Sequence, residues 1–222
     1  MDLGAYTGDT IMEFIRYAGV WRRITALEPD SETFARLEKN TAALHDCILY
    51  RLGAYSRYAR QPFAGGAGRG SHLAEDGVMT ELDSVDNILC GQSVSLINMD
   101  VEGMEAEAIT GMAKTLRRYR PKLLLALPGG MAPSERQTLV DVLVDAGVRS
   151  VVPVDESVAS AIRAGMRIDQ PYGRMNIDIG GGRTNVSVFS FGHQIVWDIL
   201  NVGGDRFDDA IIDYLRKKHN LL

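Results

Sequence analysis

The fold is decided by the segment Asp2-Leu3-Gly4-Ala5-Tyr6-Thr7-Gly8-Asp9-Thr10, which predicts the end of a strand, a glycine-bearing loop and the start of a helix. Gly4 and Gly8 allow the backbone to turn sharply and to approach a ligand closely. The helix expected over residues 9–18 then presents free backbone amides at its first turn. This pattern is compatible with nucleoside binding, and equally with an ordinary strand-to-helix turn.

A carboxylate ends the next apolar run. Glu28 follows the strand expected over residues 24–27, about 20 residues after the glycine loop, where an acidic side chain can accept hydrogen bonds from ribose hydroxyls. Together, the glycine loop and Glu28 indicate a nucleoside site more strongly than either feature alone.

Three further acids follow the strand expected over residues 94–99, namely Asp100, Glu102 and Glu105. In an open α/β sheet this is the edge at which ligands bind. The alternative is a helix N-terminus carrying acids, which is stabilising by itself.

Strands and helices alternate through the first half of the chain, which favours a parallel sheet flanked by helices and hence the α/β class. A helix is expected over residues 104–119 and a buried strand over residues 123–127. Residues 57–77 contain five glycines and predict a mobile loop or a loose hairpin. After Pro128, a helix is expected from Ser134 to Ala146 and a strand from Val151 to Val154.

The second half changes character. Three strands follow in quick succession, over residues 175–179, 185–189 and 195–202, and a last helix begins near Asp205. The first turn contains three consecutive glycines, whose backbone amides can bind phosphate oxygens. Asp178 before the turn can act on a metal-bound water, and Thr184 after it can donate a hydroxyl. A plain flexible turn is the alternative.

Composition limits the possible partners. The chain has 222 residues, a net charge of -5 and 45% hydrophobic residues. We therefore expect no nucleic-acid partner, and the run Leu123–Leu127 is too short to span a bilayer. Cys47 and Cys90 have no metal-binding or disulfide spacing. These features, with no visible signal peptide, predict a cytoplasmic protein without a metal site.

The motifs of the first half resemble FkbM-family methyltransferases. Leu3–Thr10 resembles the cofactor loop, Ala26–Asp30 the ribose-binding strand end and Ile97–Glu105 the third signature of that family. The resemblance runs from residue 1 to about residue 127, with the first strand truncated. It implies a Rossmann-like methyltransferase fold and S-adenosylmethionine as methyl donor. The implied cofactor-binding residues are Asp2, Gly4, Tyr6, Gly8, Asp9, Glu28 and Pro29.

The resemblance also implies a small-molecule methyl acceptor that usually offers an oxygen, such as a sugar hydroxyl. A hydroxyl nucleophile needs a base, and Asp100, Glu102 and Glu105 are the candidates for that role or for binding the acceptor. His72, in the glycine-rich loop, is a second candidate base.

Residues from about 120 to 222 resemble MreB, the bacterial actin homologue. Val154–Ile162 resembles its segment with a water-positioning glutamate, which matches Glu156, and Met175–Thr184 resembles its second phosphate loop. The resemblance implies Mg-ATP as a ligand, an actin-like, ribonuclease H-like subdomain, and phosphate contacts at Glu156, Asp178, Gly180, Gly181, Gly182 and Thr184. Ser157 and Arg183 depart from the family pattern, and the family's other two nucleotide loops are not found.

The two resemblances meet inside one expected strand, so we predict domains at residues 1–127 and 128–222. The chain either continues its sheet across the join, with residues 132–154 adding a helix and a strand, or is an incomplete fusion with exposed apolar faces and edges that favour homo-oligomers. The leading hypothesis is a methyltransferase, and the alternatives are an actin-like cell-shape protein or a non-functional fusion.

Overall fold

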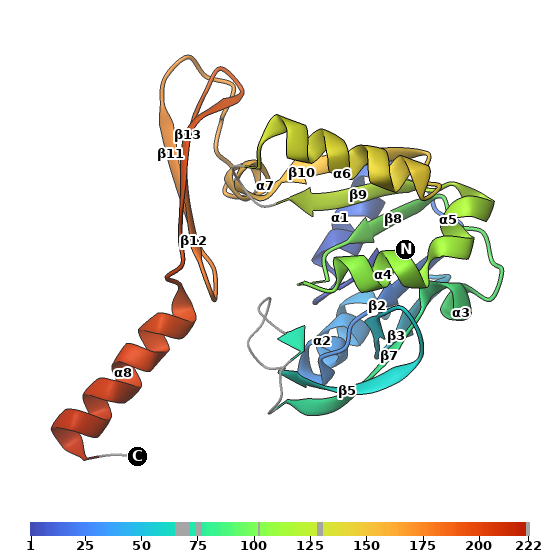
Figure 1. Ribbon diagram of the computed structural model, residues 1–222, viewed down its shortest axis with the longest axis horizontal. Coiled ribbons are helices and arrows are strands. Elements are labelled where there is room, and N and C mark those ends of the chain that lie inside the picture. The colour runs from blue at the N-terminus through green and yellow to red at the C-terminus, as the bar shows by residue number, and fades with distance from the viewer. Residues whose placement is uncertain (65–71, 74–76, 102, 128–130, 221–222) are drawn as a thin grey trace. The chain divides into compact units, whose positions relative to one another are not determined.

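The structure is a computed structural model that describes residues 1–64, 72–73, 77–101, 103–127 and 131–220. It divides into two compact units (Figure 1). The first contains Met1–Leu125 and Ser134–Pro153, and the second contains Ala126–Pro133 and Val154–Leu222.

The first unit is built on a six-stranded sheet in the order β10-β9-β8-β1-β2-β3, and every strand pair for which a register is given is parallel. The chain starts in the middle and builds outward to β3, then returns to the other side of β1 and builds outward through β8 and β9 to β10. The strands are β1 (Asp2–Leu3), β2 (Ile24–Leu27), β3 (Cys47–Tyr50), β8 (Leu96–Met99), β9 (Lys122–Leu127) and β10 (Ser150–Asp155).

Helices connect these strands and cover both faces of the sheet (Figure 1). Asp30 caps the second of them, because its carboxylate accepts a hydrogen bond from the Thr33 amide at 2.8 Å. The helices are α1 (Asp9–Ala18), α2 (Ser31–Thr41), α3 (Val85–Leu89), α4 (Glu105–Gly111), α5 (Ala113–Tyr119) and α6 (Pro133–Asp145).

The core lies along the central strands. Leu3, Ala26, Ile97 and Leu123, one from each of β1, β2, β8 and β9, are fully buried. Leu37 of α2 is also fully buried. Apolar burial on this scale provides the main favourable free energy of folding. The sheet therefore offers a rigid platform for groups at its strand ends.

A small sheet accompanies the first unit, in the order β4-β7-β5-β6. Part of residues 57–77 therefore forms a hairpin, one of the two predictions for this segment, because β5 pairs antiparallel with β6 and β7. Its strands are β4 (Gly53–Ala54), β5 (Ala59–Ala64), β6 (His72–Leu73) and β7 (Val78–Asp83).

The sheet continues past residue 127. Residues 133–145 form α6, and β10 joins the sheet beside β9. Across the predicted join the chain therefore adds one helix and one strand to the same sheet.

The second unit is an antiparallel meander of β11 (Arg174–Ile179), β12 (Thr184–Ser190) and β13 (His193–Leu200), with helices α7 (Glu156–Arg163) and α8 (Gly204–His219). The three strands and the last helix agree with the sequence prediction. Asn176 of β11 donates a hydrogen bond to Ser160 of α7 at 3.3 Å, so α7 lies against one sheet face. The other face exposes Met175, Ile177 and Ile179.

Candidate functional site

The candidate site of the first unit lies where the strand order reverses. Leu3 of β1 is in register with Leu27 of β2 on one side and Met99 of β8 on the other. The residues that follow these three positions are Gly4, Glu28 and Asp100, which therefore lie level at the carboxyl edge of three adjacent strands. Such a switch point is the usual ligand-binding position of an open α/β sheet.

Only glycine fits at position 4, because a side chain there would collide with the backbone of β8. Its φ is +81°, and a Cβ atom there would lie 1.9 Å from the carbonyl oxygen of Asp100. Its N–H donates to the Leu27 carbonyl oxygen at 3.0 Å. The loop therefore crosses directly over the end of β8 and is anchored to the end of β2.

Glu28 is 6% exposed and connects the loop to β2. One carboxylate oxygen accepts a hydrogen bond from the Tyr6 N–H at 2.9 Å, and the other accepts one from the Asp30 N–H at 3.0 Å. Burial raises the pKa of Glu28. The two hydrogen bonds act in the opposite direction, because they stabilise the charged carboxylate, but burial is the larger effect. Each oxygen still has a second lone-pair direction for a ligand hydroxyl.

Three aspartates converge at the start of this loop. Asp2 is 5% exposed, and burial raises its pKa to about 6, with smaller raising contributions from the charges of Asp9 and Asp100. Asn98 on β8 opposes that shift, because its side-chain amide donates to Asp2 at 2.8 Å. The structure thus brings together Asp2, Asp9 and Asp100 from three different elements.

The rest of the loop is held by α2. Gly8 has a φ of +86° and precedes α1, and a Cβ atom on it would lie 3.0 Å from Leu37 and 3.2 Å from Thr41. Tyr6 has a φ of 49°. Pro29 is half-buried and follows Glu28 directly.

Only part of the acidic segment after β8 is exposed to solvent. The Asp100 side chain is exposed, whereas a Glu105 oxygen accepts the Gly103 N–H at 3.1 Å and so folds back on its own turn. Glu102 and the side chain of His72 lie outside the described part of the chain. Asp100 is therefore the described candidate base that faces solvent.

Sequence patterns missed Asn98, which holds Asp2 in place. A polar residue inside an otherwise apolar strand was its only signal, and that signal does not identify its partner. The two backbone amides on Glu28 have no sequence signal, because they depend on how the loop closes.

In the second unit, Gly180, Gly181 and Gly182 form the turn between β11 and β12. The Gly180 N–H donates to the Arg183 carbonyl oxygen at 2.9 Å, which closes the turn. The carbonyl oxygens of Gly180 and Gly181 accept the amides of Gly204 and Asp205 at 2.9 and 3.0 Å. The turn therefore holds the start of α8.

The predicted phosphate-site side chains partly gather at this turn. Glu156 at the start of α7 approaches the Arg183 guanidinium at 3.8 Å. Asp178 is half-buried near the end of β11. Thr184 is buried, and its hydroxyl donates to the Val202 carbonyl oxygen at 2.7 Å, so its proton is engaged within the protein.

Comparison with known families identifies both parts. The methyltransferase FkbM domain matches residues 2–140, and the MreB/Mbl protein family matches residues 96–222, each of them more than half of the chain. The chain belongs to both families. The matches overlap over residues 96–140, which include β8, α4, α5 and β9. A Rossmann-like methyltransferase sheet thus precedes an actin-like α/β part, and the shared segment is wider than one strand.

Individual relatives match the MreB part. The cell shape-determining protein MreB of Escherichia coli K12 is 36% identical over 110 residues, covering 50% of this chain and 32% of the relative. Mbl of Bacillus subtilis is 33% identical over 103 residues, covering 46% and 31%. A crystal structure of MreB5 of Spiroplasma citri bound to AMPPNP is 31% identical, with a TM-score of 0.40, covering 51% of this chain and 37% of that one. The chain spans about a third of the length of these curated relatives.

Neither part contains a membrane-spanning candidate among the described residues, since every helix there is too short or too polar to cross a bilayer.

Proposed function

We propose that the FkbM-like unit binds S-adenosylmethionine at the switch point and methylates an oxygen of a small molecule or a sugar hydroxyl. The observation that carries this proposal is the level placement of Gly4, Glu28 and Asp100 at the ends of three adjacent strands. A buried carboxylate with remaining lone pairs, beside a loop in which Gly4 leaves no room for a Cβ atom, fits a nucleoside ligand.

The proposed cofactor-binding roles follow from where each residue lies at the switch point. Glu28, with Pro29 beside it, receives the ribose hydroxyls, and the loop from Gly4 to Gly8 approaches the rest of the cofactor with its backbone. Asp2 and Asp9 supply negative charge for a cationic ligand group at the start of α1. The cofactor, when bound, supplies an activated methyl group for in-line transfer.

Asp100 is the group best placed to act on the acceptor, because its side chain is exposed at the same edge. It removes the proton of an acceptor hydroxyl or orients that hydroxyl toward the cofactor, with Glu102 and Glu105 as the neighbouring acids. Alignment of the two reactants can provide much of the acceleration in such a transfer. Residues 57–77 are the candidate acceptor loop.

Calorimetry with S-adenosylmethionine and its demethylated product tests the proposal. Glu28→Ala should lose about 1.5–3 kcal/mol of cofactor binding, because ribose hydroxyls lose a charged acceptor. Glu32→Ala, on the exposed side of α2, is the matched control and should bind normally. Unchanged affinity in folded Glu28→Ala refutes the ribose role.

A second candidate function is Mg-ATP binding at the tri-glycine turn, as in a cytoplasmic, self-assembling actin-like protein that shapes the cell. The proximity of Glu156 to Arg183 beside that turn favours it. A ligand that binds only the folded state raises the melting temperature. The leading proposal expects S-adenosylmethionine to raise the melting temperature and Mg-ATP to leave it unchanged, whereas nucleotide binding at the tri-glycine turn expects the reverse. A shift with Mg-ATP alone reverses the order of the two proposals, and a shift with neither indicates a non-functional fusion.

A further inference from the structure

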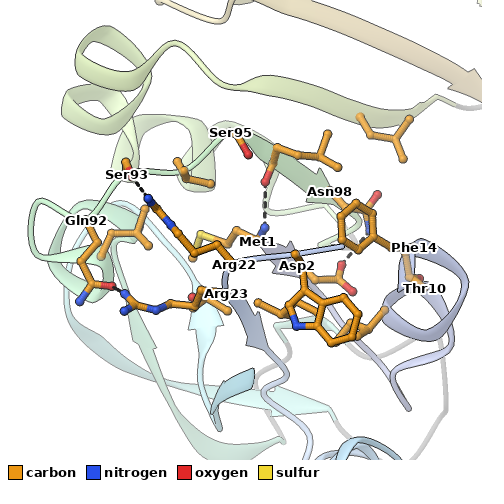
Figure 2. Close-up of a pocket in the computed structure, with 18 of the residues that line it drawn as sticks. Met1, Asp2, Thr10, Phe14, Arg22, Arg23, Gln92, Ser93, Ser95 and Asn98 are labelled. Atoms are coloured by element: carbon orange, nitrogen blue, oxygen red, sulfur yellow. Dashed lines mark hydrogen bonds between the residues drawn. The ribbon is translucent and has the colours of Figure 1, made fainter. Parts of the chain in front are cut away.

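The cofactor loop between β1 and α1, residues 4–8, is fixed where it leaves the sheet. Asn98 of β8 donates a hydrogen bond to the Asp2 carboxylate at 2.8 Å, two residues before the loop begins (Figure 2). In the middle of the loop, the Tyr6 N–H donates to the Glu28 carboxylate at 2.9 Å. Both acceptors are buried. In the described part of the chain, the last two residues of the loop form no hydrogen bond with the sheet, so they are held differently.

Helix α2 supports this outer part of the loop. The side-chain amide of Asn40, in the last turn of α2, donates to the Thr7 carbonyl oxygen at 2.8 Å. Leu37 and Thr41 of the same helix lie close to Gly8, where a Cβ atom would be 3.0 and 3.2 Å from them. Asn40 is 33 residues from Thr7 in sequence, so the contact forms only because α2 packs beside the loop.

The contact with Asn40 fixes the orientation of one peptide group. The peptide between Thr7 and Gly8 donates its N–H to the Ala5 carbonyl oxygen at 2.8 Å, while its carbonyl oxygen accepts Asn40. Both polar ends of that peptide are therefore occupied. The preceding peptide carries the Thr7 N–H, for which the described residues provide no acceptor. A backbone donor held in this way on a ligand-binding loop is suited to an anionic group.

The start of α1 favours the same kind of ligand group. The helix begins at Asp9, and Gly8 before it has no side chain that could cap the amides of the first turn. Unpaired first-turn amides and the positive end of the helix dipole favour a carboxylate over a neutral group. S-adenosylmethionine, the cofactor of the proposed function, has one carboxylate, which belongs to its amino-acid end.

We propose that Asn40 is a positioning residue of the cofactor loop and acts through Thr7 on the cofactor carboxylate, a role that rests on the proposed function. Asn40 holds the peptide between Thr7 and Gly8, so that the Thr7 N–H and the first amides of α1 meet the carboxylate together. The preference of the site for an adenosine that carries an amino-acid group therefore depends on a residue of α2, outside the glycine loop itself.

Two ligands separate this role from a purely structural one. S-adenosylhomocysteine has the carboxylate, whereas its decarboxylated analogue keeps only the adenosine, the thioether and the amine. Isothermal titration calorimetry of the full chain should show that Asn40→Ala binds S-adenosylhomocysteine on the order of fivefold more weakly, which corresponds to the loss of one hydrogen bond. Its affinity for the decarboxylated analogue should equal that of the unaltered chain. A general loosening of the loop would weaken both ligands equally.

Further variants on α2 complete the test. Asn40→Gln keeps a side-chain donor and should restore most of the affinity, whereas Asn40→Asp has no donor at neutral pH and should bind at least as weakly as Asn40→Ala. Glu38→Ala, exposed on the same helix, is the matched control and should bind both ligands normally. If Asn40→Ala fails to fold, Asn40→Asp and Asn40→Gln give the same comparison.

The possible failures are distinguishable. Unchanged affinity of Asn40→Ala for S-adenosylhomocysteine, or an equal loss for both ligands, overturns the positioning role and leaves the proposed function intact. Failure of the unaltered chain to bind either ligand overturns the proposed function and the positioning role with it.

Discussion

The Glu28 carboxylate accepts the backbone N–H of Tyr6 at 2.9 Å, across 22 residues of sequence. Its other oxygen accepts the N–H of Asp30, so one side chain fixes both the glycine loop and the start of α2. Glu28 therefore has a structural role as well as the proposed ribose role, and the two roles require different measurements.

The structural role of Glu28 predicts a loss of stability on its removal. Glu28→Ala leaves two backbone amides without their acceptor, and each such loss costs about 1–3 kcal/mol when the group is buried. Glu28→Gln keeps one acceptor oxygen and should lose less. Urea unfolding of both variants, beside Glu32→Ala, measures the difference. Equal stability of Glu28→Ala and Glu32→Ala contradicts the role.

Gly4 should tolerate alanine much less well than Gly19. Both have positive φ, +81° and +70°, so both substitutions incur the left-handed backbone cost of about 1–2 kcal/mol. Only at Gly4 does the new Cβ atom meet a backbone oxygen, that of Asp100 at 1.9 Å, whereas nothing lies within 4 Å at Gly19. Thermal unfolding should therefore show a larger loss for Gly4→Ala. Similar losses would mean that the loop does not cross β8 closely.

The titration of Asp2 should lower the free energy of unfolding as the pH rises. Its pKa is raised from 3.8 to about 6 in the folded state, so the folded state binds the proton more tightly than the unfolded state does. This contribution to stability is present below pH 4 and is lost as the pH rises to about 6, and it amounts to about 3 kcal/mol.

Asp2→Asn removes that titration. The stability of the variant relative to the unaltered chain should improve progressively between pH 4 and pH 6.5, as measured by urea unfolding at each pH. A difference between the two proteins that stays constant with pH would contradict a buried, protonatable Asp2.

Gly203 should control the attachment of α8 to the tri-glycine turn. A Cβ atom there would lie 2.3 Å from the Gly181 carbonyl oxygen, whereas nothing lies within 4 Å of one at Gly182. Gly203→Ala should therefore speed hydrogen exchange at the Gly204 and Asp205 amides, and Gly182→Ala should not. Unchanged exchange in Gly203→Ala would contradict this attachment.

Much of the fold could be predicted from local patterns. The meander of β11 to β13 and the strands before Glu28 and Asp100 follow from apolar runs bounded by glycines and acids. The helix expected over residues 104–119 is instead two helices that meet at Met112. Beside the break, Gly111 lies against the Tyr55 backbone, where a Cβ atom would be 1.8 Å from a carbonyl oxygen. Such a contact has no local signal.

The positions of the site residues could be predicted from the sequence, whereas their hydrogen-bond partners could not. Strand ends locate Gly4, Glu28 and Asp100, because parallel strands share one carboxyl edge. The partners of Glu28 and the Asn98 contact to Asp2 depend on register between distant segments. The division at residue 127 and the roles of individual site residues stay predictions.

Isothermal titration calorimetry of the full chain with the demethylated cofactor, S-adenosylhomocysteine, tests the central claim most directly. The account predicts saturable binding that weakens on the order of tenfold in Glu28→Gln, because a ribose hydroxyl loses a charged acceptor, and stays unchanged in Glu32→Gln. No binding at millimolar concentration, or equal binding by Glu28→Gln, would contradict it.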